Sequence, residues 1–293
     1  MDDTPLVTGR LNPLNDYLFM RMMGEKGDEQ QLSGFLNAVL RRTGKDKLIS
    51  VEILENKIFT AEILGNKSSV LDIRAVLPDG TKTNIEVQLR NLGNMDKRSL
   101  FYWCLEYIQG IEAGQDYLEL PNVIAINIVN FQFINSQNFH TTFHLWEDTD
   151  KDCLLTDALE IHFVDMAKFR RLGKKDIKQD PLHRWLSYFD KDSPPEIVEE
   201  VIKMDQAIQK AQEKVSHVSL DKEALRAYKM REMALSDWTS GINYAKQEGL
   251  QKGLQAGRQE SKLETARNMK ADGEPVSKII KYTGLTEQQI KEL

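Results

Sequence analysis

The fold of this chain is decided by residues 69–89, which read SVLDIRAVLPDGTKTNIEVQL. Apolar and polar residues alternate on both sides of a central Pro78-Asp79-Gly80. Alternation with a period of two is typical of a β-strand that buries one face. Proline fixes its own φ angle and glycine accepts a positive φ, so the central residues favour a tight turn. The stretch therefore predicts a β-hairpin with strands over 69–77 and 81–89.

The predicted strands separate apolar from polar side chains, because successive residues of a strand point to opposite faces. One face collects Leu71, Ile73, Ala75, Leu77, Ile85, Val87 and Leu89. The other face, which we expect to be turned toward solvent, collects Asp72, Arg74, Asn84, Glu86 and Gln88.

Two carboxylates on the polar face suggest a metal site. A turn centred on Asp79-Gly80 places Asp72 opposite residue 86 or 87, about 5 Å from Glu86 if both share a face. Carboxylates that close repel each other unless a cation lies between them, and oxygen ligands suit Mg²⁺. Gln88, on the same face, is placed to orient a water molecule. The structural alternative is an ordinary polar sheet face on which Arg74 forms an ion pair with Asp72.

The segments around the hairpin predict a mixed α/β fold. Helical spacing of apolar residues predicts helices over 28–42 and 95–110. The run PNVIAINIVN at 121–130 is apolar at nearly every position, as in a central strand covered on both faces. Weaker alternation predicts further strands over 50–60, 141–148 and 159–169. The order favours a mixed sheet flanked by helices rather than a sandwich or a bundle.

Beyond residue 178 the composition becomes helical, so we expect a core domain at 1–178 and a helical region at 179–293. Helices are predicted over 180–189, from 195 to about 214, and over 221–269, followed by two short helices at the end. A capping box, Thr286-x-x-Gln289, predicts the start of the last one. Every fourth residue of the long helix is small: Ala245, Gly249, Gly253, Gly257 and Ser261. This stripe is consistent either with another helix packing against it, in the same chain or in a homo-oligomer, or with a partly frayed helix.

Composition excludes several classes of protein. The 293 residues carry 39 Lys and Arg against 45 Asp and Glu, a formal net charge of −6. No stretch approaches the roughly 18 apolar residues of a membrane helix, and the first residues do not have the pattern of a secretory signal. Two cysteines, Cys104 and Cys153, cannot form a multi-disulfide framework. We therefore expect a cytoplasmic protein.

A nucleic-acid ligand would require local basic surface despite the acidic balance. Residues 168–178 hold six basic residues and one acid, although a solvated connector would have the same composition. His140 and His144 stand four apart in a strand-like context, about 13 Å along a strand, which favours a structural role. The candidate phosphate-binding residues are Arg74, Arg90, Lys97, Arg98, Arg170, Arg171, Lys174 and Lys175.

The hairpin, the aromatic helix and the apolar strand together resemble the PD-(D/E)XK nuclease superfamily, and within it the branch of recombination-promoting nucleases and transposases. The resemblance covers essentially the whole chain. Its motifs are Asn12–Phe19 with Gly24, Leu32–Leu40, Asp72 with Ile85-Glu86-Val87-Gln88, Lys97–Trp103, Gly114–Ile124, the repeat QEGLQKGLQAG at 247–257, and Thr283–Thr286.

The resemblance implies an αβββαβ core and Mg²⁺-dependent DNA cleavage, with Mn²⁺ as a possible substitute. It makes Asp72 and Glu86 the metal ligands, puts Gln88 in the place of the superfamily lysine, and includes Asp16 among the catalytic candidates. Met20 stands where this branch commonly has a lysine, and Arg21 follows it.

The sequence thus predicts a metal-dependent DNA endonuclease linked to recombination or mobile elements. A second hypothesis is a catalytically weak DNA-binding or oligomeric interaction protein that keeps the nuclease fold, since Gln88 and Met20 replace expected lysines. RNA cleavage fits the same chemistry.

Overall fold

A computed structural model describes residues 9–54, 73–109, 111 and 114–293. The chain forms two compact units, one ending at Arg231 and the other spanning Glu232–Leu293. No helix in the described part is long and apolar enough to cross a membrane.

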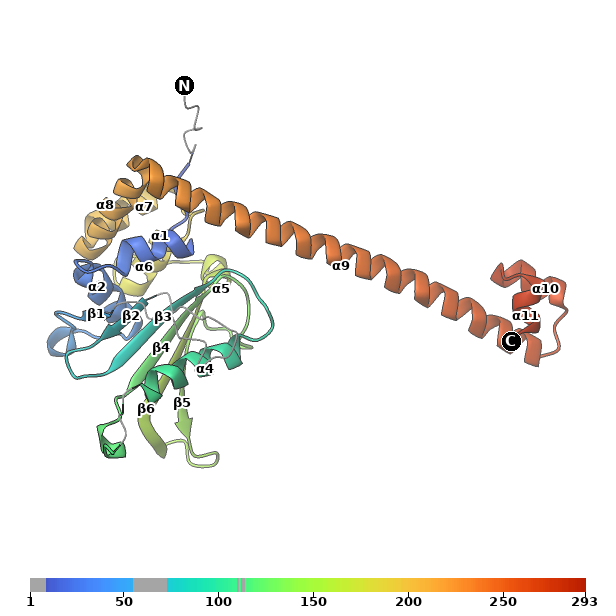
Figure 1. Ribbon diagram of the computed structural model, residues 1–293, viewed down its shortest axis with the longest axis horizontal. Helices are drawn as coiled ribbons and strands as arrows, with labels where there is room; N and C mark the ends of the chain where they lie inside the picture. The colour runs from blue at the N-terminus through green and yellow to red at the C-terminus, as the bar shows by residue number, and fades with distance from the viewer. Residues whose placement is uncertain (1–8, 55–72, 110, 112–113) are drawn as a thin grey trace, which may run out of the picture. The chain divides into compact units, whose positions relative to one another are not determined.

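The first unit is built on a six-stranded mixed sheet, which confirms the predicted α/β class (Figure 1). The strand order is β1-β2-β3-β4-β6-β5. The central strands β3, β4 and β6 run parallel, and β1, β2 and β5 are antiparallel to their neighbours. The strands are β1 (Glu52–Leu54), β2 (Ile73–Val76), β3 (Lys82–Gln88), β4 (Val123–Val129), β5 (His140–Trp146) and β6 (Leu154–Asp165).

The predicted hairpin is β2 and β3. Ile73 pairs with Ile85 and Val76 with Lys82, which is one of the two registers that the turn at Pro78-Asp79-Gly80 allows. Gly80 has a φ of 86°, a conformation that glycine adopts without steric cost. Asp72 lies outside the described residues, as does the part of the predicted strand 50–60 that follows Leu54.

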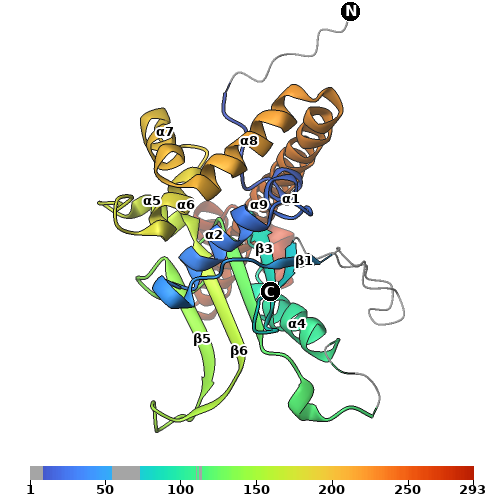
Figure 2. The ribbon, with the colours of Figure 1, turned by 90° about the vertical axis from the view of Figure 1, so that its left-hand side faces the viewer.

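The apolar face of the hairpin packs against helices. These are α1 (Asp16–Met23), α2 (Glu29–Val39), α6 (Pro181–Phe189) and α8 (Gln206–Leu220), and α2 crosses this face in Figure 2. Gly34 permits the close crossing of α2 and α8, because a Cβ added there would lie 2.5 Å from the Cβ of Ala207. Sheet, α2 and α6 share one core, to which Ile85, Phe35 and Trp185 contribute.

The polar face of the hairpin is also covered, which corrects the expectation that it faces solvent. Helix α4 (Met95–Ile108) lies over it (Figure 1), and Arg74, Asn84 and Glu86 are all buried. A second apolar core lies between α4 and the neighbouring strands β4 and β6. Charged and polar side chains of α4 meet those of the hairpin, so the polar face is stabilised by complementary groups rather than by water.

The strand predicted at 159–169 differs from β6 at both ends. It begins earlier, at Leu154, and stops at Asp165, where α5 (Met166–Arg171) begins. The Asp165 side chain accepts a hydrogen bond from the backbone N–H of Lys168, which caps the new helix. The apolar residues Met166 and Phe169 that resembled a strand are therefore the buried side of a helix.

The first helices after residue 178 belong to the first compact unit. Besides α6 and α8 they include α7 (Pro195–Met204), and Asp205 separates α7 from α8 by capping the latter. Trp185 and Phe189 are fully buried against Phe35 of α2. These helices lie in one core with α1 and α2, and the division into domains at residue 178 stays a prediction.

The second unit has a small core of its own. It contains most of α9 (Lys222–Ala271), then α10 (Val276–Thr283) and α11 (Glu287–Lys291). Ala266, Ile279, Leu285 and Ile290 form the core, and the predicted capping box of Thr286 and Gln289 is present. The glycine stripe of α9 lies in open space, with no described atom within 4 Å of an added Cβ at 249, 253 or 257. Helix packing against it stays a prediction.

Candidate active site

Glu86 is the buried acidic residue at the centre of the candidate site. It lies near the carboxyl end of β3 with 1% of its surface exposed. A buried carboxylate requires a compensating cation, and Arg98 of α4 supplies it, its Nη2 atom 3.3 Å from Glu86 Oε2. The Arg98 side chain is 31% exposed and its guanidinium also lies over the Tyr102 ring, 5.1 Å from the centroid. Arg98 therefore connects the buried carboxylate with the molecular surface.

Asn127 lies beside Glu86 and was missed by the sequence argument. It is the register partner of Glu86 on β4, and its side-chain Nδ2 donates to Ser99 Oγ of α4 at 2.8 Å and to the His162 carbonyl at 3.1 Å. Its side chain therefore faces α4, as that of Glu86 does. The single amide within the apolar stretch Val123–Val129 was the signal that could have revealed it.

Two further predicted catalytic residues flank this position. Gln88 ends β3 and is half-buried, and its Nε2 donates to the Arg90 carbonyl at 3.1 Å. Asp72 lies outside the described residues, and Ile73 with Ile85 is the last described pair on its side of the hairpin. Its pairing with Glu86 stays a prediction.

Arg74 has a structural environment. It is 4% exposed, and its guanidinium forms a buried ion pair with Glu106 of α4, with Nη2 2.8 Å from Oε2. The sequence suggested a phosphate contact or an ion pair with Asp72. A described partner is a carboxylate 32 residues further along the chain, on α4, and since Asp72 lies outside the described residues, an ion pair with it stays a prediction.

The amino-terminal motif forms α1. Asp16, the first residue of that helix, is about half exposed, and its Oδ2 lies 3.7 Å from Arg231 Nη1. Met20 is half-buried against the main core, so it does not present a polar group in place of the lysine. Arg21, the suggested substitute, is exposed and pairs with Glu25 on its own helix.

The basic candidates divide between the edge of the sheet and the surface. Arg170 donates from Nη1 to Asn130 Oδ1 at 2.6 Å, and the Asn130 backbone N–H donates to the Gln88 carbonyl at 3.0 Å. Arg170 is also held by Asp190 at 2.9 Å. This contact chain places the start of the basic segment at the carboxyl end of β3. Of the others, Lys97, Arg171 and Lys174 are exposed, Arg90 is half-buried, and Lys175 lies over the Phe169 ring, 4.7 Å from its centroid.

The histidines lie on the other face of the sheet. His140 contacts His162 at 2.8 Å, and His144 lies 3.5 Å from Glu160. Burial, and secondarily the neighbouring His162, lower the pKa of His140 to about 4. Within the described ranges, no group of three or more His, Cys, Asp or Glu side chains is arranged to hold a metal ion.

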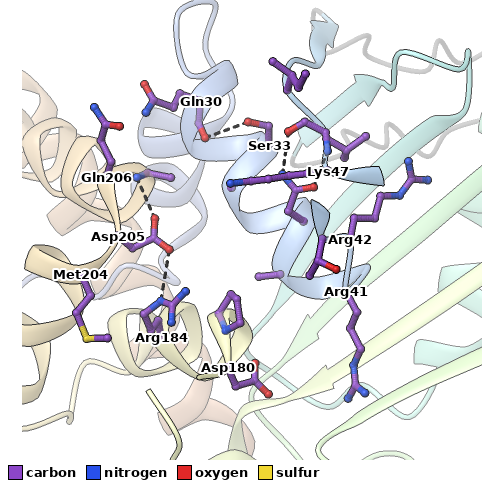
Figure 3. A pocket seen from close by; sticks show the side chains of 18 of the residues that line it. Gln30, Ser33, Arg41, Arg42, Lys47, Asp180, Arg184, Met204, Asp205 and Gln206 are labelled. Atoms are coloured by element: carbon purple, nitrogen blue, oxygen red, sulfur yellow. Dashed lines mark hydrogen bonds and ion pairs between the residues drawn. The ribbon is translucent and has the colours of Figure 1, made fainter. Parts of the chain in front are cut away.

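A cavity of about 930 Å³ lies between α2, α6 and the start of α8 (Figure 3). Its walls are built by elements that cover the face opposite Glu86, so it is separate from the candidate site. Arg184 there is paired with Asp205, 3.5 Å away, and the guanidinium groups of Arg41 and Arg42 point apart from each other in Figure 3. The cations of this cavity do not converge on a common point.

The fold defines a class of protein. A mixed sheet in which a hairpin is followed by a helix and a parallel strand is the arrangement of a PD-(D/E)XK nuclease core. The model of the PD-(D/E)XK nuclease family transposases matches residues 13–245, and the chain belongs to this family. Searches among curated proteins and among solved structures found no match.

Proposed function

We propose that this protein is a metal-dependent DNA endonuclease that hydrolyses phosphodiester bonds in recombination or in the movement of mobile elements. The observation that carries the proposal is the Glu86 carboxylate. It is buried under α4, is linked to the surface through Arg98, and lies in the Glu86-Val87-Gln88 stretch to which the resemblance assigns the catalytic residues. Burial of an ionised group is costly and calls for a functional or structural reason.

The residues present fit a divalent cation. Glu86 supplies a carboxylate, and the adjacent Asn127 has a buried Oδ1 without a hydrogen-bond donor among the described residues. Oxygen donors of this kind suit Mg²⁺ or Mn²⁺. By resemblance, Asp72 joins Glu86 in holding the metal. When bound, the metal lowers the pKa of a water molecule and neutralises charge on the phosphate.

The protein side chains position the reactants. Gln88 is proposed to orient the attacking water, and Arg98 to contact the scissile phosphate at the mouth of the site. Arg90 and Arg170 are placed near the carboxyl end of β3, and Lys97, Arg171, Lys174 and Lys175 extend the basic surface for the DNA backbone. Asp16, paired with Arg231, is proposed to support α1. Arg74 supports α4 through Glu106.

A plasmid-nicking assay with Mg²⁺ or Mn²⁺ tests the proposal. We expect Glu86→Gln and Asp72→Asn to lower the nicking rate by roughly 100- to 1,000-fold, because each removes charge stabilisation at the phosphate. Glu147→Gln, at an exposed carboxylate of the β5–β6 hairpin, is the control and should keep the full rate. DNA affinity, measured without metal by fluorescence anisotropy, should change little in all variants.

The outcome also decides between substrates and between functions. Equal nicking by the unchanged chain and by both site variants would contradict the assignment, and preferential cleavage of an RNA substrate would change the substrate class. DNA binding without cleavage by the unchanged chain would favour a catalytically weak DNA-binding protein. That alternative is supported by Met20, whose side chain packs in the core where a lysine is expected.

A further inference from the structure

The side chain of Asn127 contains an oxygen that the fold leaves without a donor. Asn127 is 1% exposed, and its Oδ1 has no hydrogen-bond partner among the residues that the structure describes. An unsatisfied buried acceptor costs about 1–3 kcal/mol. An apolar residue would avoid this cost in a strand that is otherwise apolar from Val123 to Val129, apart from this position. The oxygen therefore calls for a ligand.

The orientation of the amide follows from its contacts. The His162 carbonyl on β6 can only accept a hydrogen bond, so the Asn127 atom beside it at 3.1 Å must be Nδ2 and not Oδ1. Since Nδ2 is engaged on the β6 side, the oxygen of the planar amide is turned away from β6. Ser99 of α4 fixes the same nitrogen from above at 2.8 Å. The amide is thus held at two points while its oxygen is left available.

Glu86 is the neighbour on the side away from β6. Asn127 and Glu86 are register partners on adjacent parallel strands, and such strands lie about 4.8 Å apart. Both side chains reach contacts on α4, Glu86 with Arg98 and Asn127 with Ser99, so both lie on the same face. The two side chains are therefore neighbours under α4.

We infer that Asn127 is a ligand of the divalent metal at this site, with Oδ1 as a neutral oxygen donor beside the Glu86 carboxylate. The inference rests on the proposed nuclease function, because it adds a ligand to the metal of that reaction. It assigns β4 a direct part in the site and gives Ser99 the role of a positioning residue that holds the amide in place.

Binding of Mn²⁺ to the full chain, measured by electron paramagnetic resonance without DNA, tests the inference separately from activity. Asn127→Leu removes the oxygen and should raise the Kd for Mn²⁺ by about 10- to 100-fold. Asn127→Asp keeps an oxygen and adds charge, so it should bind Mn²⁺ at least as tightly as the unchanged chain. Ser99→Ala breaks the bond to Nδ2 but leaves Oδ1 in place, and should change the Kd only a few-fold.

If the Asn127 amide has only a structural role, the order of Mn²⁺ affinities of Asn127→Asp and the unchanged chain is reversed. Aspartate cannot donate to the His162 carbonyl, so a structural role predicts that Asn127→Asp weakens Mn²⁺ binding, and this result overturns the inference even if the leucine variant fails to fold. A Kd for Asn127→Leu equal to that of the unchanged chain also overturns it. If Glu86→Gln still abolishes binding in that case, the proposed function stands. No Mn²⁺ binding by the unchanged chain would overturn the inference and weaken the proposed metal dependence as well.

Discussion

At the scale of single residues, the polar face of the hairpin depends on charges that are neutralised by α4. Glu86 is paired with Arg98, and Arg74 with Glu106. In the first pair the sheet supplies the acid and α4 the base, and in the second pair the sheet supplies the base and α4 the acid. Helix α4 is therefore held over the site by two ion pairs, and its register on the sheet determines where Arg98 meets Glu86.

The Arg74–Glu106 pair gives a prediction about stability. Arg74→Met leaves the Glu106 carboxylate buried without its main cation, so we expect a loss of about 3–5 kcal/mol in the free energy of unfolding. The double variant Arg74→Met with Glu106→Leu removes both charges, and should recover most of that loss. Urea unfolding of the unchanged chain, both single variants and the double variant measures the coupling.

Additive losses in this double-mutant cycle would show that the two side chains do not compensate each other. The comparable pair on the surface, Lys203 with Glu199 on α7, is largely exposed and serves as the control. Its disruption should cost no more than about 1 kcal/mol.

At the scale of elements, the pairing of β5 with β6 brings His140 against His162 on the face opposite the candidate site. Burial first, and then His162 and Arg41, lower the pKa of His140 from 6.5 to about 4, while Asp180 and Glu160 act in the opposite direction. In the unfolded chain His140 takes up a proton near pH 6.5, but in the folded chain it does so only near pH 4. The unfolded state thus binds more protons in this window.

The free energy of unfolding should therefore fall as the pH drops from about 6.5 to 4. Above that window, the contribution of neutral His140 to stability is fully present. For this partly exposed group we expect a loss of about 2 kcal/mol after allowance for solvent screening. Chemical denaturation at pH 7.5 and pH 4.5 measures it, and His140→Asn should flatten the difference. The control is His217→Asn, at an exposed position of α8; an equal flattening there would contradict the assignment to His140.

At the scale of the whole molecule, each of the two compact units has core residues of its own. Ile208 is fully buried in the main core of the first unit and Ile279 in the core of the second unit. Because the cores share no residues, each unit should unfold with its own transition. Segment-resolved hydrogen exchange should show that Ile279→Ala destabilises residues 263–293 by about 2–5 kcal/mol and leaves the sheet unchanged.

The reciprocal variant, Ile208→Ala, should destabilise the sheet and α2 without an effect on α10 and α11. Loss of protection in both units from either substitution would show that they fold as one cooperative block.

Much of the fold was predictable because it depends on local patterns. Alternation around Pro78-Asp79-Gly80 specified the hairpin, the apolar run 121–130 specified β4, and Thr286 with Gln289 specified the start of α11. Glu86 and Gln88 were identified as site candidates for the same reason, since both are placed by the period of one strand. These features depend on residues that are near one another in the chain.

Which faces meet was decided only by the tertiary structure. A period of two shows that Arg74 and Glu86 share a face, but not that α4 covers that face, or that Glu106 of α4 pairs with Arg74. Composition shows that the chain becomes helical after residue 178, but not that α6 and α8 pack on α2 within a compact unit that ends at Arg231. Asn127 reads as one polar residue in an apolar strand until the sheet sets it beside Glu86. Local periodicity determines where helices and strands form. The site is determined by how distant elements bury one another, because the free energy of covering a face of the sheet depends on residues far away in the chain.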